Sequence, residues 1–234
     1  FNPVLKEGRL YGRGSGDNKA GVVVHYNVVK KLLENLPVNI RIFIEGEEEI
    51  GSPTMSDFIE QNREALEADV IVIADSANVK IGVPTITTTL RGLVDGFIEV
   101  NQPMRPVHSG MGGGIVPDAF MVLSKIIASF HDDKGNLQIE GLTPTDMNVE
   151  ELDESYTKKM LGSEEINLFD AESISKRLWL EPALDVLAID APPVKDAVNL
   201  VIPKASAKIS LRLPPTEDPE HAMKMLEEHV MKNI

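Results

Sequence analysis

Two strand-like segments that end in acidic residues constrain the fold of this chain most strongly. The segment 40–44 (IRIFI) is followed by EGEEEIGS at 45–52, and the apolar segment 70–74 (VIVIA) is followed by Asp75. Acids at the end of a buried strand repel one another and lose water, unless cations neutralise them or one of them serves as a base. Ligands of open α/β sheets bind at the carboxyl ends of strands. The pattern therefore predicts an α/β fold with a polar site at this edge.

A third acid, Asp17, lies in the glycine-rich turn GRGSGDNKAG at 12–21. Taken alone, the acidic run at 45–52 is equally compatible with a solvated loop. Asp17, Glu49 and Asp75, however, all lie where a turn or a strand meets a loop. Carboxylate oxygens suit divalent cations, with zinc–oxygen distances of ~2.0–2.2 Å. We therefore predict that these three carboxylates converge on one metal site.

The apolar pattern divides the chain into two predicted domains, 1–90 and 91–234. The first alternates helices at about 22–36 and 54–66 with the two strand-like segments, which is typical of a mostly parallel α/β sheet. The second is predicted to contain a strand at 94–100, a helix at 118–130, a loop-rich stretch at 131–180, strands near 186–190 and within 199–213, and a helix after Asp218. This order suggests an α+β sandwich of ferredoxin-like type.

Composition excludes several classes of protein. The chain has no cysteine, so any metal must be held by oxygen and nitrogen ligands. Its formal net charge of −14 disfavours nucleic-acid binding. No run approaches the ~18 apolar residues of a membrane span, and the first residues, FNP, lack signal-peptide character. We expect a cytoplasmic protein with neither a nucleic-acid nor a membrane partner.

Several motifs, in this order, resemble the M20 family of metallopeptidases and amidohydrolases. They are YGRGSGDNK at 11–19, EGEEEIGS at 45–52, Asp75, VHSG at 107–110 with two further glycines, and NLVIP at 199–203 leading into SLRL at 210–213. They span nearly the whole chain. Within the family, which includes acetylornithine deacetylase and succinyl-diaminopimelate desuccinylase, the first two motifs look most like the dipeptidase branch.

The resemblance implies a partial catalytic domain at 1–90 that binds two divalent metal ions of the zinc type. Asp17 would bridge the ions, and Glu49 and Asp75 would each complete one side. Glu48 would be the general base that takes a proton from water and delivers it to the leaving amine. Members of this family commonly have a cis peptide between Asp17 and Asn18, and we expect one here.

The resemblance also implies a lid and dimerisation domain at 91–234. His108 is similar to the lid histidine that reaches across a homodimer to the tetrahedral oxyanion. Arg212 is similar to the arginine that binds a substrate carboxylate in a fork geometry, and Asn199 is a further candidate for substrate contact. The substrate would be a small peptide or an N-acyl amino acid.

Two family features have no match in the sequence. A metal-binding His before the glycine turn and a second one after the lid are both missing, so we expect a partial chain whose metals can be absent. His221 and His229 share a helix face, which we interpret as solvated rather than as a metal pair. Two alternatives stay open: an N-acyl amino acid deacylase, such as a desuccinylase, and a catalytically inactive member of the family.

Overall fold

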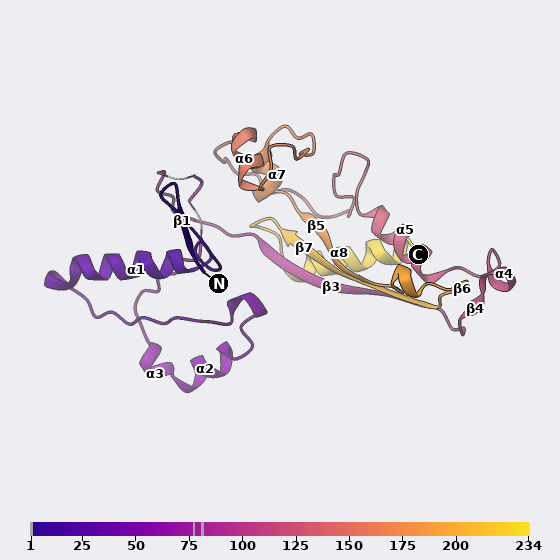
Figure 1. Cartoon of the computed structure of the whole chain (residues 1–234), viewed down its shortest axis with the longest axis horizontal. Helices are drawn as coiled ribbons and strands as arrows, with labels where there is room; N and C mark the ends of the chain where they lie inside the picture. Colours follow the sequence, from indigo (N-terminus) through magenta and orange to yellow (C-terminus); the bar gives the residue numbers. More distant parts are fainter. Residues whose placement is uncertain (1, 77, 81) are drawn as a thin grey trace. The chain divides into compact units, whose positions relative to one another are not determined.

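The chain folds into two units, Phe1–Thr87 and Thr88–Ile234 (Figure 1). The structure is a computed structural model that describes residues 2–76, 78–80 and 82–234. Among the described residues, no helix combines the length and the apolar character needed to cross a membrane.

The first unit begins with a hairpin and a long helix. Strands β1 (Val4–Lys6) and β2 (Arg9–Tyr11) pair antiparallel. The two turn residues between them, Glu7 and Gly8, both have positive φ, as a tight two-residue hairpin requires. Helix α1 (Lys19–Leu32) follows the glycine turn and continues into a 3₁₀ turn.

Two short helices, α2 (Met55–Gln61) and α3 (Arg63–Leu66), occupy the region predicted as one helix. Asn62 lies between them with non-helical backbone angles (φ −120°, ψ 22°), which end the first helix, although its N–H still donates to the carbonyls of Phe58 and Ile59. The rings of Phe58 and Phe43 stack with centroids 5.3 Å apart.

The two predicted strands of the first unit are not formed. Residues 40–44 and 70–74 have no strand hydrogen bonding, and the side chains of Val70 to Ile73 are 73–79% exposed. A strand needs a neighbour to pair its backbone groups, and the described part of this unit supplies none for either segment. The described residues accordingly contain no parallel sheet, and the prediction of one is not confirmed.

The second unit is built on a sheet in the order β3-β7-β5, antiparallel throughout. Its strands are β3 (Gly92–Asn101), β5 (Ala183–Asp190) and β7 (Lys204–Leu213). Along β7, every second residue from Ala205 to Leu213 is buried, which is the two-residue period of a strand with one covered face.

Helices α5 (Ala119–Ser129) and α8 (Pro219–Lys232) pack against this sheet. The order β3, α5, β5, β7, α8 is the predicted strand–helix–strand–strand–helix order. The first turn of each helix is capped by an aspartate, as its sequence predicts. The core between helices and sheet consists of Val94, Ile98, Ala119, Leu123, Ile126, Phe130, Ile139, Leu184, Ala205, Ala207, Ile209, Leu211, Leu213, Ala222 and Leu226.

A small two-stranded element lies at one end of this sheet (Figure 1). Strand β4 (Val107–His108) pairs antiparallel with β6 (Leu200–Val201), and the short helix α4 (Ser109–Gly112) follows β4 directly. His108 lies opposite Leu200 in this pairing.

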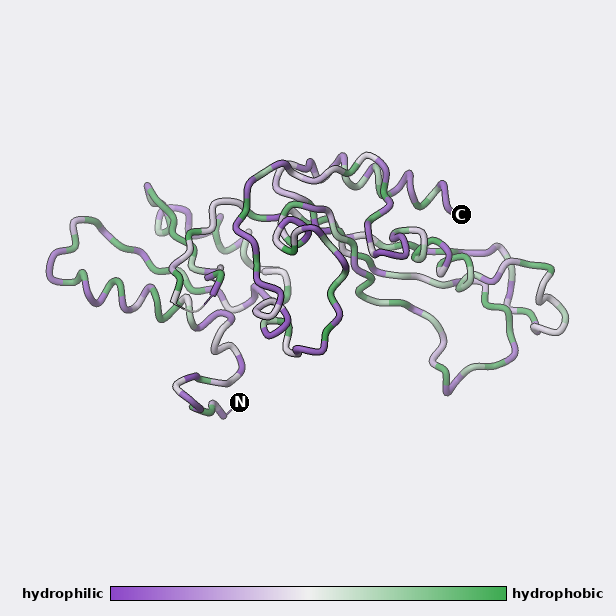
Figure 2. The backbone as a smooth tube through the Cα atoms, turned by 90° about the horizontal axis from the view of Figure 1, so that it is seen from above, coloured by the Kyte–Doolittle hydropathy of each residue, from purple (hydrophilic) through white to green (hydrophobic). Residues whose placement is uncertain are grey.

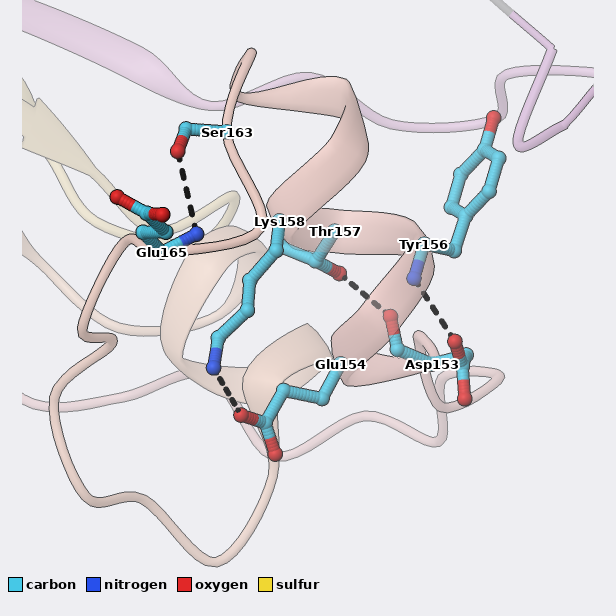
Figure 3. A network of polar contacts seen from close by, with 7 residues as sticks. All are labelled: Asp153, Glu154, Tyr156, Thr157, Lys158, Ser163 and Glu165. Atoms are coloured by element: carbon cyan, nitrogen blue, oxygen red, sulfur yellow. Dashed lines mark hydrogen bonds and ion pairs between the residues drawn. The ribbon is translucent and has the colours of Figure 1, made fainter.

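The stretch predicted as loop-rich contains two short helices, α6 (Glu154–Met160) and α7 (Ile174–Trp179). Figure 3 shows how α6 begins: Asp153 accepts a hydrogen bond from the N–H of Tyr156 (2.8 Å), and its carbonyl accepts one from the hydroxyl of Thr157 (2.9 Å). Helices this short depend on such caps, which weak apolar periodicity does not reveal.

Candidate active site

The glycine turn before α1 holds Asp17 in place. The N–H of Ser15 donates to the carbonyl of Gly12 (3.1 Å), and the N–H of Lys19 donates to the carbonyl of Gly14 (3.0 Å). Gly14 has φ +71°, a left-handed backbone conformation that favours glycine. The peptide between Asp17 and Asn18 is cis, as predicted.

Asn18 connects the glycine turn with the segment that ends in Asp75. Its Nδ2 donates to Oδ1 of Asp75 (2.7 Å) and to the carbonyl of Ala74 (3.0 Å). The structure therefore brings the neighbourhood of Asp17 together with Asp75, although 58 positions (17 to 75) separate these two carboxylates.

Glu48 and Glu49 lie in a 3₁₀ turn, Glu48–Ile50, directly after the acidic loop begins. Gly51 ends the turn in the left-handed region (φ 84°), and its N–H donates to the carbonyl of Glu48. Ser52 also has positive φ (51°), and its N–H bonds to the carbonyl of Glu47 at 3.0 Å. These bonds fix the backbone that carries the two adjacent carboxylates.

The carboxylate of Glu48 has a raised pKa, although its side chain is exposed. Loss of water around the carboxylate is the largest cause, and repulsion by neighbouring negative charges adds to it. These charges belong to Glu49, Asp75, Asp17 and Glu45, in order of decreasing effect. Three segments of the first unit thus concentrate negative charge around one carboxylate.

The carboxylate oxygens around Glu48 are chemically suitable ligands for a divalent cation. Among the described residues, no three or more His, Cys, Asp or Glu side chains are arranged to hold one metal ion. The predicted arrangement needs only two carboxylates of this chain for each ion, Asp17 with Glu49 and Asp17 with Asp75. Oxygen donors suit such ions, and a cation relieves the crowding of charge around Glu48. The shared metal site stays a prediction.

The two remaining acids of the run, Glu45 and Glu47, are half-buried. Oε2 of Glu47 accepts a hydrogen bond from the hydroxyl of Thr54 (2.6 Å), so Glu47 braces the loop against the start of α2. Oε1 of Glu45 is buried without a hydrogen-bond partner. Both residues line a hollow of about 260 Å³ beside the stacked pair of Phe43 and Phe58.

In the second unit, His108 caps the start of α4. Its Nδ1 accepts a hydrogen bond from the N–H of Gly110 (3.0 Å). Because a backbone N–H can only donate, the neutral imidazole carries its proton on Nε2. The N–H of Ser109 donates to the carbonyl of Asn199 (2.8 Å), and His108 pairs with Leu200, so each of the two candidates lies next to a residue that contacts the other strand's segment.

Arg212 lies near the other end of β7, opposite Leu93 on β3 and Ala183 on β5. Arg212 lies eight positions after Lys204, at which β7 begins, and at a rise of ~3.4 Å per residue this is about 27 Å. Strands β4 and β6, with His108, lie at the end of the sheet where β7 begins (Figure 1). One copy of this unit therefore does not bring His108 and Arg212 together.

Arg91 lies near Arg212, and the sequence motifs did not indicate it as a candidate site residue. Burial lowers the pKa of the Arg91 guanidinium, the charge of Arg212 lowers it further, and Asp185 opposes both. Arg91 directly precedes β3, two positions before Leu93, which lies opposite Arg212.

The two C-terminal histidines differ from each other. His221 is exposed, as predicted, and pairs with Glu217 at 2.7 Å. His229 is half-buried: its Nε2 lies 2.9 Å from the hydroxyl of Ser129, and its ring stacks on Phe130. The prediction of a solvated face is therefore wrong for His229, because α8 turns this side chain against the end of α5.

Comparison with known proteins gives consistent matches. The family model of Peptidase family M20/M25/M40 matches residues 1–231. A cysteinylglycine-S-conjugate dipeptidase of Corynebacterium striatum is 35% identical over 96% of this chain and 51% of its own length. A human beta-Ala-His dipeptidase is 30% identical over 96% of this chain and 47% of its own length.

Among solved structures, an M20 family metallo-carboxypeptidase from Sulfolobus solfataricus superposes with a TM-score of 0.76. It is 30% identical and is matched over 98% of this chain and 55% of its own. These likenesses support the predicted α/β fold class. The chain spans about half the length of the curated relatives it matches.

Proposed function

The chain belongs to Peptidase family M20/M25/M40, and from this premise we propose that it is part of a metal-dependent hydrolase that cleaves the peptide bond of dipeptides. The observation that carries the proposal is the convergence of negative charge on Glu48 from carboxylates of three separate segments. The names of the relatives, a cysteinylglycine-S-conjugate dipeptidase and a beta-Ala-His dipeptidase, support a dipeptide as substrate.

Asp17, Glu49 and Asp75 are the residues that would hold two divalent cations of the zinc type. When bound, such cations polarise a scissile carbonyl and acidify a water molecule. The three carboxylates supply oxygen donors, and Asn18 fixes one oxygen of Asp75. Because the chain has no cysteine, further ligands would be nitrogen or oxygen donors.

Glu48 would act as the general base. Its raised pKa makes the carboxylate a better proton acceptor than an isolated glutamate. It would take a proton from the attacking water and later pass it to the amine that leaves. Its neighbour Glu49 cannot point in the same direction from the same turn, which fits a division of labour between base and ligand.

His108 would stabilise the oxyanion that develops on the attacked carbonyl. The hydrogen bond from Gly110 leaves Nε2–H as a donor, and a donor aimed at developing negative charge is what this step needs. Arg212 would bind the carboxylate of the substrate, since a guanidinium matches a carboxylate with two parallel hydrogen bonds.

The placement of these two residues supports a homodimer. His108 lies on the β4-β6 element at the end of the sheet where β7 begins, whereas Arg212 lies about 27 Å further along β7 from Lys204, at which this strand begins. A dipeptide is shorter than this distance, so both can act on one substrate only if one of them comes from a second copy. We assign the second unit the role of lid and dimerisation domain on this ground.

The proposal is tested on the full-length protein after chelation and reconstitution with zinc. Turnover is measured on a panel of dipeptides beside N-succinyl and N-acetyl amino acids. We expect zinc-dependent cleavage of dipeptides at a rate at least tenfold above that of the acylated amino acids. Faster cleavage of the acylated amino acids would indicate a deacylase, and metal binding without turnover of either class would indicate an inactive member of the family.

A further inference from the structure

Asn18 uses every polar atom of its side chain. Its Oδ1 accepts a hydrogen bond from the N–H of Gly21 (2.9 Å), which caps the first turn of α1. Its Nδ2 donates to Oδ1 of Asp75 (2.7 Å) and to the carbonyl of Ala74 (3.0 Å). A primary amide has two N–H donors, and both are used across 56 to 57 positions of sequence.

The orientation of this amide is fixed by its partners. If the amide were flipped, Nδ2 would face the Gly21 N–H, donor against donor. Its oxygen would then face the carboxylate of Asp75 and the carbonyl of Ala74, acceptor against acceptor. Only one of the two orientations satisfies the surrounding groups, so the donation to Asp75 follows from chemistry as well as from distance.

Close packing at Gly21 holds the two segments together independently. A Cβ at this position would lie 2.1 Å from the carbonyl oxygen of Ala74 and 2.5 Å from Oδ1 of Asn18. Gly21 is buried, and it is the one buried residue in the part of the first unit that the structure describes. The start of α1 therefore abuts the backbone that leads into Asp75.

We propose that Asn18 is a positioning residue that orients Asp75 toward a divalent cation shared with Asp17. The inference rests on the proposed function, because it takes both aspartates as metal ligands. A neutral amide suits this role, since it occupies one oxygen of Asp75 and leaves the other oxygen and the full negative charge available to the cation. A lysine or arginine in its place would neutralise the charge that attracts the metal.

The test separates positioning from helix capping with two variants of the full-length protein. Asn18→Ser keeps a good capping oxygen but cannot reach Asp75, and Asn18→Leu loses both functions. The affinity for Zn²⁺ is measured on the chelated protein by competition with a chromophoric chelator. The absorption spectrum of bound Co²⁺ reports the coordination geometry, and the thermal midpoint of the metal-free protein reports the fold.

We expect both variants to lose about 10–100-fold in Zn²⁺ affinity, the usual effect of removing a group that orients a ligand. The Co²⁺ spectrum should change in both, whereas the metal-free midpoint should fall only in Asn18→Leu. Asn27→Ser is the matched control: Asn27 lies on the same helix, its amide bonds only to the carbonyl of Val23 (2.8 Å), and its loss should leave Zn²⁺ affinity unchanged.

Native-like Zn²⁺ affinity and Co²⁺ spectrum in Asn18→Ser would overturn the inference, whatever Asn18→Leu does, and would leave only the capping role. That outcome leaves the proposed function standing, because the unsubstituted protein still binds zinc. If the unsubstituted protein binds no zinc, the proposed function fails and the positioning role fails with it.

Discussion

The two units use their apolar residues in opposite ways. In the second unit, a sheet and two helices enclose a core in which Phe130, Leu211 and Leu213 are fully buried. In the described part of the first unit, the apolar runs at 40–44 and 70–74 are exposed and Gly21 alone is buried. Figure 2 shows hydrophobic residues along both units. The units therefore differ in whether other elements bury these residues, rather than in their composition.

This contrast separates two roles within one chain. The second unit stabilises itself by packing, and its polar candidates, His108 and Arg212, are carried on paired strands. The first unit concentrates acids at the ends of residues 40–44 and 70–74. No element in the described part of this unit packs over these two segments. We propose that residues 40–44 and 70–74 gain strand neighbours from further parts of the full-length protein, which would also hold the carboxylates more rigidly.

The largest expected effect belongs to the first unit and to chemistry. Glu48→Gln keeps the size of the side chain but removes the proton acceptor, so kcat in the full-length protein should fall by about 10²–10⁴-fold. Zinc stoichiometry should stay native, because Glu49 rather than Glu48 is the proposed ligand. Steady-state kinetics and metal analysis of the same preparations check both expectations.

Two neighbouring variants serve as controls for this prediction. Glu49→Gln should weaken zinc binding, and Glu47→Gln should do little to either quantity, since Glu47 bonds to Thr54 away from the reacting groups. Near-normal turnover in Glu48→Gln with full zinc would contradict the assignment of Glu48 as base.

The next effect contrasts burial in the two units directly. Leu123 is fully buried, so Leu123→Ala should lower the free energy of unfolding by about 2–5 kcal/mol. Val72 is 73% exposed, and Val72→Ala in the chain of residues 1–234 should change the free energy by less than about 0.5 kcal/mol. Urea unfolding of the chain measures both.

Val72→Ala can also be measured in the full-length protein, where it tests whether residues 70–74 become buried. If residues 70–74 gain strand neighbours there, Val72→Ala should cost on the order of 1–2 kcal/mol, because burial of each methylene contributes about 0.8 kcal/mol. A cost that stays near zero in the full-length protein would contradict the proposed burial of this segment.

Sequence patterns predicted the second unit better than the first for a physical reason. Strand β7 and helix α5 carry their own period of two and of 3.6, and their partners lie within the chain. The segments 40–44 and 70–74 carry equally apolar residues, but pairing depends on neighbours that periodicity does not describe. The helices α6 and α7 were missed because local caps such as Asp153 start them rather than an apolar stripe.

The motifs predicted which residues form the candidate site, but not the contacts between them. The placement of Asp17, Glu49 and Asp75 where a turn or a strand meets a loop predicted a common neighbourhood, and the raised pKa of Glu48 reflects the charges of all three. The role of Asn18 was missed, because only the folded chain shows that its amide reaches Asp75. Separation of His108 from Arg212 likewise follows from strand register, which the motifs do not contain.

A smaller effect compares two capping side chains, one in each unit. Asp118 caps α5 through the N–H of Met121 (3.0 Å) and also accepts from the N–H of Ile202 (3.1 Å). Asp118→Ala should cost about 1–3 kcal/mol, because a cap is lost and a part-buried N–H is left unpaired. Asn18→Ala should cost about 1 kcal/mol or less in the chain of residues 1–234, since Gly21 is the one buried residue in the described part of the first unit. An equal loss in the free energy of unfolding for Asp118→Ala and Asn18→Ala, measured by urea unfolding, would contradict this difference between the two caps.

The smallest effect concerns pH and a residue that the second unit half-buries. Burial lowers the pKa of His229, the charge of Lys232 lowers it further, and hydrogen bonding to Ser129 together with the charge of Glu140 and the backbone of Gln138 opposes the change. A histidine whose pKa is lower in the folded chain binds protons less tightly than in the unfolded chain. Its contribution to stability is therefore complete above the ordinary value of about 6.5 and is lost as the pH falls through the lower folded value.

His229→Gln tests this sign, because glutamine can still bond to the hydroxyl of Ser129 but does not titrate. The difference in thermal midpoint between the unsubstituted chain and His229→Gln is measured at pH 7.5 and at pH 5.5. Contributions of all other titrating groups are common to both proteins and cancel in this difference. We expect the unsubstituted chain to lose a few degrees or less relative to the variant on acidification. A gain relative to the variant would mean that the folded chain prefers the charged imidazole, against the burial of this ring between α5 and α8.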